Sequence, residues 1–357
     1  MSRFHPLTVT EVRRETADSV SIRFAVPEDL KAAFAFVPGQ YLTLRRSIDG
    51  EEIRRSYSIC SGLDDGDLRV GVKQVRGGAF SRYANETLRP GDVVEAMPPA
   101  GRFTAVPDVA NSRHVLCIAA GSGITPVLSI VRSLLSREPG TRVTLVYGNR
   151  TSAGAMFAEE IEDLKNRHLG RFGVVHVLSR EPQDVELLNG RIDARKLEAF
   201  AGGVLDLASV TDAYVCGPEE MVAEVKTGLA ALGVPPDRIR SELFTPAAPR
   251  KVFVPPAGEA ATQTLASIVV KLDGARHVFD MHAGDENIVA AAARAGLDLP
   301  HSCKGGMCCT CRCRVEEGAA EMAVNYSLAE WETKAGFVLA CQSRPTTRNL
   351  SLDFDAM

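Results

Sequence analysis

The sequence contains no apolar run near the roughly 20 residues that a membrane-spanning helix requires, so it predicts no such helix. The continuous apolar stretch at residues 115–120, which no other run exceeds, has the length of a buried strand. The N-terminal residues carry no apolar segment of the kind found in secretory signals, and we therefore expect none. The net charge is −4, so no excess of either sign points to nucleic acid or an anionic membrane as a partner.

The composition is otherwise that of a globular protein, with 45% hydrophobic and 24% charged residues among 357. This length predicts two or three domains. The nine cysteines are an odd number, and five of them fall within residues 303–313. This distribution argues against the disulfide framework of a secreted protein and favours a metal site in a reducing compartment. We therefore expect a cytoplasmic protein.

The cysteine-rich stretch has a defined spacing. Cys303, Cys308 and Cys311 form C-x4-C-x2-C, and Cys341 follows about thirty residues later, which is the plant-type [2Fe-2S] pattern. Zinc sites usually combine a close cysteine pair with a second pair or with histidines, so a structural zinc site is the weaker alternative. A cluster carries one electron at a time, and the rest of the chain should supply the source or the destination.

The remaining cysteines do not fit the cluster spacing. Cys309 and Cys313 are interpreted as spare thiols, either buried or at the solvent edge, and Cys60 and Cys117 as small core residues.

Residues 1–108 contain many short β-rich runs punctuated by turn pairs such as Pro38-Gly39 and Asp49-Gly50. Many short strands with frequent turns predict an antiparallel barrel. The runs include Leu7–Val12, Ser19–Val26, Tyr41–Arg45 and Leu68–Val75.

One further run in this part contains Arg55-Ser56-Tyr57-Ser58. Alternation places Arg55 and Tyr57 on one face of a strand and the two serines on the other. A guanidinium for a pyrophosphate, an aromatic ring for stacking and a hydroxyl opposite a ring nitrogen would together hold a flavin. Alone, the pattern is equally that of a surface strand with an ordinary arginine.

A second element of the same kind ends a strand at Val72 and Lys73 and continues into the glycine pair Gly77-Gly78. Ser81 then lies in the first turn of an expected helix. Backbone N–H groups at such a helix start face an anion. A simple hairpin turn is the alternative.

From about residue 111 continuous apolar strands alternate with helices, which predicts a parallel sheet covered on both faces over residues 109–245. The first strand leads into Gly121, Gly123 and Thr125, and glycines at a strand-to-helix turn allow a pyrophosphate to approach. The third glycine of the full dinucleotide fingerprint is missing, so an ordinary turn shares this pattern.

The ends of the second and third strands of this sheet carry Asn149-Arg150 and Ser179-Arg180, with Arg191 further on. An acidic residue that would accept the ribose 2′-hydroxyl of NAD is absent after the second strand. The basic residues would suit a 2′-phosphate and predict a preference for NADPH, with NADH still possible. Solvated surface arginines beside Glu181 are the alternative.

Residues 246–264 are rich in proline and alanine, a composition typical of a linker, and would leave the following domain mobile. Phe244, just before it, either covers the flavin ring or packs in the core. Beyond the linker, two short strands joined by Asp273-Gly274 predict a hairpin, and a helix from about residue 287 to 295 leads to the cysteine loop.

Together these patterns resemble, along the full length, the oxygenase reductases of the ferredoxin–NADP reductase family. The resemblance implies an FAD-binding barrel, an NAD(P)-binding α/β domain and a β-grasp ferredoxin domain over residues 265–357. It also implies hydride transfer to the flavin, with Ser58 near N5 and Cys216 beside the nicotinamide as catalytic residues. The flavin would contact Arg55, Ser56, Tyr57, Ser58, Val72, Lys73, Gly77, Gly78 and Ser81. The nucleotide would contact Gly121, Gly123, Thr125, Asn149, Arg150, Ser179, Arg180, Cys216, Gly217 and Pro218, and Phe244 would cover the ring. The cluster would be held by Cys303, Cys308, Cys311 and Cys341.

At finer grain, several stretches resemble the reductase subunits of bacterial phenylacetyl-CoA epoxidases, which are di-iron monooxygenases. These stretches are residues 54–60, 78–84, 147–152, 190–193, 325–328 and 353–355. The resemblance implies FAD, NADPH and a di-iron oxygenase subunit as electron acceptor. Cys309 departs from it, since small residues are usual there. A reductase of another oxygenase or hydroxylase, or a redox-sensing or zinc-stabilised binding protein, are the alternatives.

Overall fold

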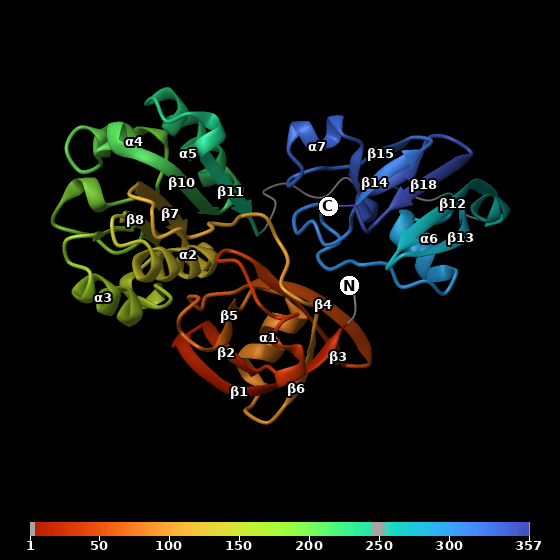
Figure 1. Ribbon diagram of the computed structural model, residues 1–357, viewed down its shortest axis with the longest axis horizontal. Coiled ribbons are helices and arrows are strands. Elements are labelled where there is room, and N and C mark those ends of the chain that lie inside the picture. Colours follow the sequence, from red (N-terminus) through yellow and green to blue (C-terminus); the bar gives the residue numbers. More distant parts are fainter. Residues whose placement is uncertain (1–3, 245–252, 254–255, 257, 357) are drawn as a thin grey trace. The chain divides into compact units, whose positions relative to one another are not determined.

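The computed structural model describes residues 4–244, 253, 256 and 258–356 (Figure 1). Contacts divide the chain into two compact units, one within residues 4–247 and the other within residues 248–357. Each unit buries its own hydrophobic core. The barrel and the nucleotide half that the sequence predicts therefore share the first unit, and the ferredoxin-like part forms the second.

The N-terminal part of the first unit is an antiparallel sheet that closes on itself, as predicted. Its strands follow the order β4-β3-β6-β1-β2-β5, and a bridge between Ile59 and Val70 joins the two edges. Alternate residues such as Val20, Ile22 and Phe24 point into one buried core. The elements are β1 (His5–Thr16), β2 (Ser19–Ala25), β3 (Tyr41–Ile48), β4 (Glu51–Ser58), β5 (Leu68–Lys73), α1 (Ala79–Glu86) and β6 (Val93–Ala96).

The second part of this unit is a parallel sheet with strand order β11-β10-β7-β8-β9 and helices on both faces. One hydrophobic cluster lies between the sheet and helices α2 and α3, and another lies on the side of α4 and α5. The elements are β7 (His114–Ala120), α2 (Ile124–Arg137), β8 (Arg142–Asn149), α3 (Ala158–Arg167), β9 (Phe172–Leu178), α4 (Ala194–Ala201), β10 (Val210–Gly217), α5 (Glu219–Ala231) and β11 (Ile239–Leu243).

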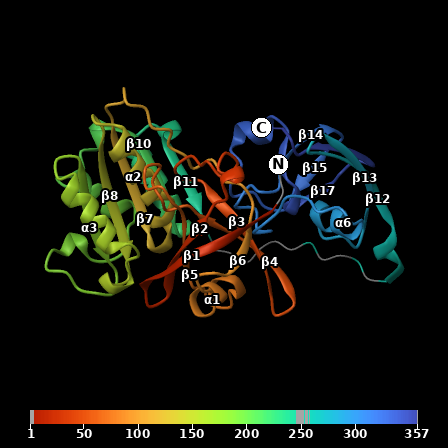
Figure 2. The same ribbon diagram turned by 60° about the horizontal axis from the view of Figure 1, so that its bottom comes forward.

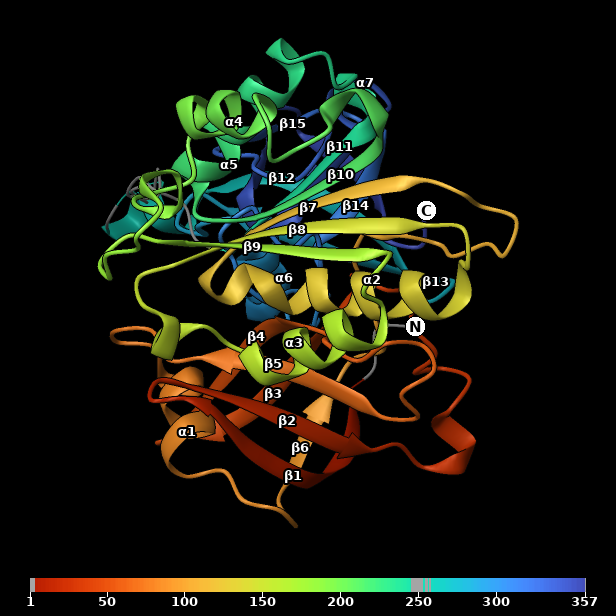
Figure 3. The same ribbon diagram turned by 90° about the vertical axis from the view of Figure 1, so that its left-hand side faces the viewer.

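Helices α2 and α3 lie on the face of the parallel sheet that is turned toward the barrel (Figure 3). Glu160 on α3 is the centre of the contact between the two parts. Its carboxylate accepts hydrogen bonds from Arg69 on β5 at 2.7 and 2.9 Å and from Arg132 on α2 at 2.6 Å, and it also pairs with Arg13 on β1. One carboxylate thus joins two barrel strands to a helix of the nucleotide half.

The second unit is a five-stranded sheet of order β13-β12-β18-β14-β16, with β12 and β18 parallel and α6 packed near the β12–β13 hairpin (Figure 2). Asp273 and Gly274 both adopt positive φ in the predicted hairpin turn, and the Asp355 carboxylate accepts from their N–H groups at 2.7 and 2.8 Å. The elements are β12 (Thr264–Leu272), β13 (Ala275–His282), α6 (Ile288–Arg294), β14 (Arg312–Glu317), β15 (Ala320–Met322), α7 (Glu330–Lys334), β16 (Phe337–Leu339), β17 (Ser343–Pro345) and β18 (Asn349–Asp353).

The predicted linker, residues 246–264, falls largely outside the described residues. Within it, residues 258–262 form a short 3-10 helix, and Thr264 begins β12. The guanidinium carbon of Arg344 lies over the Phe253 ring, 3.6 Å from the centroid of that ring. Among the helices that the structure describes, none is both long and apolar enough to cross a membrane.

Replacing Glu160 should weaken the contact between barrel and nucleotide half. In Glu160→Gln the three guanidinium groups lose the carboxylate that they share, although Arg13 keeps Glu15 and Arg132 keeps Asp65, and we expect the free energy of unfolding to fall by about 2 to 4 kcal/mol. Glu162→Gln is the matched control on the same helix, because its contacts with Lys165 and His176 are partly solvated and should contribute less than about 1 kcal/mol. Chemical denaturation measures both variants, and equal losses would contradict the assignment.

Candidate flavin, nucleotide and cluster sites

The predicted flavin strand is β4, and its side chains alternate as expected. Arg55 is exposed, while Ser58 is buried. The Tyr57 ring lies 5.4 Å from the Phe80 ring on α1, and burial raises the pKa of its hydroxyl, which therefore stays protonated. Ser56 shares a 3.2 Å hydrogen bond with Thr43 on the neighbouring strand. The strand therefore presents a cation, an aromatic ring and hydroxyls, which is a chemically suitable set for a flavin nucleotide.

The glycine turn before α1 is closed by its own residues. Gly77 has φ +74°, and Gly78 is the N-cap of α1. The Ser81 hydroxyl accepts from the Val75 N–H at 3.2 Å and donates to the Gly78 carbonyl at 3.1 Å. The hydroxyl thus shapes the turn, and the backbone N–H groups in the first turn of α1 are the donors suited to a phosphate.

Lys73, at the end of β5, is engaged by a carboxylate. Its ammonium pairs with Asp18 at 3.0 Å. Val72 beside it is buried in the barrel core. Of these two predicted flavin contacts, Lys73 is paired with a carboxylate and Val72 is a core residue. Their side chains therefore stabilise the end of β5, and neither offers a free charge to the flavin.

The turn after β7 lies where the strand order reverses, because β7 is flanked by β8 on one side and by β10 on the other. Such a switch point is where α/β sheets bind their ligands. Gly121 has φ +54°, and a Cβ added at Gly123 would lie 2.2 Å from the Cys216 carbonyl oxygen. The Thr125 hydroxyl closes the turn by donating to the Ser122 carbonyl at 2.9 Å. Gly121 is thus favoured because its φ is positive, and Gly123 is required because a side chain there would collide with β10.

This turn also approaches the barrel. Gly71 on β5 has no room for a side chain, because a Cβ there would lie 2.4 Å from the Thr125 side chain. The bridge between Ile59 and Val70 places the end of β4 next to the same part of β5. The flavin strand and the nucleotide turn are therefore neighbours of one strand, which is the arrangement that hydride transfer between their ligands needs.

Cys216 lies at the end of β10, directly beside Glu242 on β11. Burial raises the pKa of the Cys216 thiol, and the nearby Glu242 carboxyl raises it further, so the thiol stays neutral. Burial also raises the pKa of Glu242 from 4.5 to about 8, and its Oε2 has no hydrogen-bond partner among the residues described. Gly217 follows Cys216 in a tight turn, since a Cβ there would lie 2.6 Å from the Met221 side chain.

Glu242 was not anticipated from the sequence. The sequence shows an acidic residue two positions before Phe244. That this residue lies beside Cys216 follows from the pairing of β10 with β11. Phe244 is partly buried and packs against the core cluster that includes Cys216. Pro218 at the start of α5 is exposed.

The four residues predicted to bind a 2′-phosphate come together at the ends of two adjacent strands. The Ser179 N–H donates to the Asn149 carbonyl at 3.0 Å, and the Arg180 N–H donates to the Arg150 carbonyl at 2.8 Å. Both arginines are exposed, and the described residues form no ion pair with either guanidinium. The two cations are therefore available to an anion.

Two neighbouring charges are already engaged. The Ser152 N–H and hydroxyl hold the Glu181 carboxylate at 2.8 and 2.9 Å. Arg191 lies 3.8 Å from Glu220. Glu181 is therefore satisfied by a serine. Of the three arginines predicted to suit a 2′-phosphate, Arg191 has a carboxylate partner among the residues described, whereas Arg150 and Arg180 do not.

The four predicted cluster cysteines come together as two close pairs. Cys303 and Cys308 share a hydrogen bond, and so do Cys311 and Cys341. Pairing with Cys308 lowers the pKa of Cys303 to about 5, and pairing with Cys311 lowers the pKa of Cys341. A thiolate is the form that binds metal, so each pair has a ready ligand.

The donors around these sulfurs also suit a cluster. The Gly305 N–H points at Cys303 Sγ at 3.3 Å, the Thr310 hydroxyl at Cys308 Sγ at 3.2 Å and the Gln342 amide at Cys341 Sγ at 3.3 Å. Among the described residues, no group of three His, Cys, Asp or Glu is arranged around a single ion. Two sulfur pairs match two iron atoms better than one tetrahedral zinc.

The other cysteines are used differently, as predicted. Cys309 is half-buried, and its thiol donates to the Ser327 hydroxyl at 3.0 Å. Cys60, Cys117 and Cys313 are fully buried in the hydrophobic cores.

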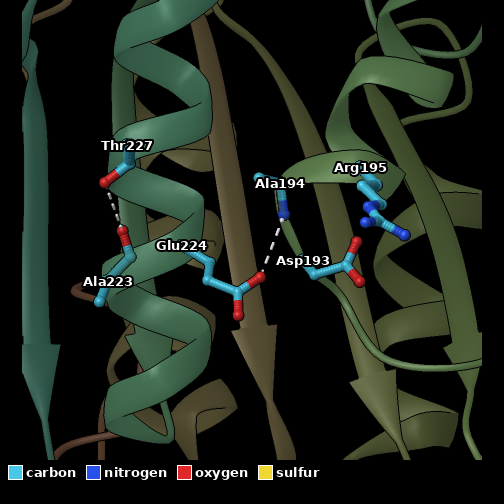
Figure 4. Close-up of a pocket in the computed structure, with 6 residues that line it drawn as sticks. All are labelled: Asp193, Ala194, Arg195, Ala223, Glu224 and Thr227. Carbon is cyan, nitrogen blue, oxygen red and sulfur yellow. Dashed lines mark hydrogen bonds between the residues drawn. The ribbon is translucent and has the colours of Figure 1, made fainter.

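A separate hollow of about 540 Å³ lies between α4 and α5 (Figure 4). Its lining includes Asp193, which caps α4 by accepting from the Lys196 N–H at 2.8 Å, and Glu224, which accepts from the Ala194 N–H at 3.4 Å. None of the predicted site residues lines it. Its two carboxylates cap the N-terminus of α4, so this hollow is not a site for the chemistry above.

Known families match three parts of the chain. The oxidoreductase FAD-binding domain matches residues 6–105, the oxidoreductase NAD-binding domain residues 117–227, and the 2Fe-2S iron-sulfur cluster binding domain residues 270–346. One subunit of the 1,2-phenylacetyl-CoA epoxidase of Escherichia coli (strain K12) is 44% identical, over 100% of this chain and 99% of that protein. The chain belongs to the ferredoxin–NADP reductase family of oxygenase reductases.

Other reductases share the full length. The ferredoxin reductase component of 3-ketosteroid-9-alpha-monooxygenase from Rhodococcus rhodochrous is 36% identical, over 99% of this chain and 97% of that one. The solved structure of phthalate dioxygenase reductase has the same fold, with a TM-score of 0.59 and 22% identity over 98% of both chains.

The reductase therefore uses FAD, a pyridine nucleotide and a [2Fe-2S] cluster, and it is a component of an oxygenase system. The predicted fold class and enzyme class are confirmed. These matches decide against a zinc-stabilised or redox-sensing binding protein.

The raised pKa of Glu242 makes stability depend on pH. The folded protein keeps a proton that the unfolded chain releases above about pH 4.5, so stability falls as pH rises and reaches its minimum above about pH 8. Glu242→Gln should remove this loss, because a neutral amide replaces the buried acid. Denaturation of both proteins at pH 6 and pH 9 measures it. A variant with the same pH dependence as the parent would refute the assignment.

Proposed function

We propose that this reductase oxidises NADPH and delivers electrons to a di-iron phenylacetyl-CoA epoxidase in the cytoplasm. The observation that carries the proposal is the 44% identity over the whole chain with the epoxidase component of Escherichia coli. A second candidate is the reductase of a different monooxygenase. The 36% identity with the 3-ketosteroid-9-alpha-monooxygenase reductase component, also over nearly the whole chain, favours it.

FAD, when bound, would convert a two-electron hydride into the single electrons that a [2Fe-2S] cluster carries. In the proposed flavin site, Arg55 binds the pyrophosphate, Tyr57 packs against the ring and Ser58 hydrogen-bonds near the reacting nitrogen. The backbone before α1 binds the phosphate, with Ser81 holding that turn in shape. Each of these roles uses a group whose position is described above, and together they fix the flavin on the barrel.

In the proposed nucleotide site, Gly121 and Gly123 admit the pyrophosphate at the start of α2. Cys216 lies beside the nicotinamide as a neutral thiol, which excludes water without adding charge. Glu242 is protonated below about pH 8 and keeps this pocket uncharged at neutral pH. Phe244 bounds the pocket in this proposal, which its packing against the same core supports.

In the proposed cluster site, Cys303 and Cys308 bind one iron and Cys311 and Cys341 the other. The sulfur pairs and their N–H and amide donors support this division. The proposed domains are the barrel at residues 1–108, the nucleotide domain at 109–245 and the ferredoxin domain at 265–357. The family matches at 6–105, 117–227 and 270–346 fall within these bounds.

The preference for NADPH rests on Arg150 and Arg180. In a variant with both changed to alanine, kcat/KM for NADPH should fall about tenfold to a hundredfold, because two charge-assisted bonds to the 2′-phosphate are lost. The value for NADH should change less than threefold, by roughly 0.6 kcal/mol. Arg191→Ala is the comparison variant, and it should cost less because this arginine of the same basic set already has Glu220 as a partner. Steady-state kinetics with both nucleotides would refute the preference if the two values fell equally.

The acceptor is tested by reconstitution. Adding the reductase to candidate di-iron oxygenase subunits should produce NADPH- and oxygen-dependent conversion of phenylacetyl-CoA, measured by product formation. Reduction of cytochrome c by the same preparation is the control for reductase competence. If cytochrome c is reduced but phenylacetyl-CoA is not converted, the partner assignment is wrong while the reductase remains intact. Conversion of a steroid substrate with steroid oxygenase subunits would then favour the second candidate.

A further inference from the structure

The Gly306 carbonyl, within the cysteine loop, points toward residues 326 and 327 and accepts from two donors there. The Tyr326 N–H lies 3.1 Å from this oxygen, and the Ser327 hydroxyl also lies 3.1 Å from it. Gly306 itself has φ +78°, and a Cβ there would approach the Val324 carbonyl oxygen to 3.3 Å. The positive φ at this position therefore favours glycine, and the close neighbours leave little room for a side chain.

The two donors come from a rigid turn. The Asn325 side-chain oxygen accepts from the Ser327 N–H at 3.1 Å and from the Leu328 N–H at 2.8 Å, and its amide donates to the Leu328 carbonyl at 3.0 Å. Leu328 is buried in the core of the unit. The Cys309 thiol donates to the Ser327 hydroxyl at 3.0 Å. Ser327 therefore contacts the loop at two points, and the turn that carries it is anchored in the core.

The orientation of the Gly306 carbonyl fixes that of the next N–H group. In a trans peptide the C=O and N–H point in opposite directions, so an outward carbonyl at Gly306 turns the Met307 N–H inward. This N–H donates to the Cys303 sulfur. The Gly306 N–H donates to the Cys341 sulfur. Donors to cluster sulfurs stabilise the more negative, reduced form and raise its potential.

We propose that Ser327 is a positioning residue for electron transfer, which holds the Gly306 carbonyl outward so that the Met307 N–H keeps its bond to the Cys303 sulfur and sets the reduction potential of the cluster. This inference rests on the proposed cluster ligands. It assigns a role to the 325–328 turn and to the thiol of Cys309, neither of which is used in the proposed ligand set.

The test is a redox titration of the full-length, cluster-loaded protein, followed by electron paramagnetic resonance. Ser327→Ala removes one of two donors, and we expect the equilibrium for cluster reduction to fall about threefold, which is roughly 30 mV to more negative potential. Ser327→Thr keeps the hydroxyl and should leave the potential unchanged, while Ser327→Cys, a weaker donor, should give a smaller negative shift. Thr333→Ala is the matched control, because within the described part of the chain its hydroxyl bonds to the Glu330 carbonyl on α7 and not to the cysteine loop.

An unchanged potential in Ser327→Ala at full spin count would overturn the proposal, and so would an equal shift in Thr333→Ala. If Ser327→Ala loads no cluster, the comparison of the cysteine and threonine variants decides. A more negative potential in Ser327→Cys than in Ser327→Thr supports the proposal, and equal potentials in these two variants overturn it. The spin count tests the ligand set separately, because a full cluster in Cys303→Ala would defeat that set and this inference with it.

Discussion

The packing of Gly123 against the Cys216 carbonyl is the contact on which the nucleotide half depends. It brings β10 against the start of α2, so the turn after β7 and the residue beside the proposed nicotinamide site move as one body. The same helix is fixed to the barrel along its length, because Ser129 donates to the Ser61 carbonyl at 2.6 Å and Ser133 accepts from the Leu63 N–H at 3.1 Å. A shift at Gly123 would therefore change the distance between the proposed sites of the flavin and the nicotinamide.

Much of the fold follows from local patterns in the sequence. The continuous apolar run at residues 115–120 becomes β7, because a strand buried on both faces needs no polar alternation. Asp273-Gly274 forms the predicted turn because both positions require positive φ, which these residues tolerate. The cysteine pattern brings its four sulfurs together because three of them lie in one loop. Each of these signals is contained in a short segment.

The features that the sequence did not reveal depend on segments that meet only in the folded chain. Glu242 acquires its raised pKa because β11 pairs with β10, and no neighbour in the sequence announces that burial. Glu160 reads as an ordinary exposed helix residue until three arginines from β1, β5 and α2 reach it. The Ser81 hydroxyl bonds to the backbone of Val75 and Gly78 in its own turn. The residue type alone does not determine whether such a serine bonds to its own turn or to a ligand.

The position of β18 has a consequence for the order of events during synthesis. It lies between β12 and β14 in the middle of its sheet, although it is the last of the described strands to be made. The sheet that carries the cysteine loop therefore stays open until residues 349–353 have been translated and inserted between their neighbours. The barrel also waits for its last strand, because β6 lies between β3 and β1, but the barrel and the nucleotide half precede β18 in the chain and can fold while translation continues. We therefore expect iron–sulfur loading to follow the synthesis of β18, after the flavin-binding part has been made.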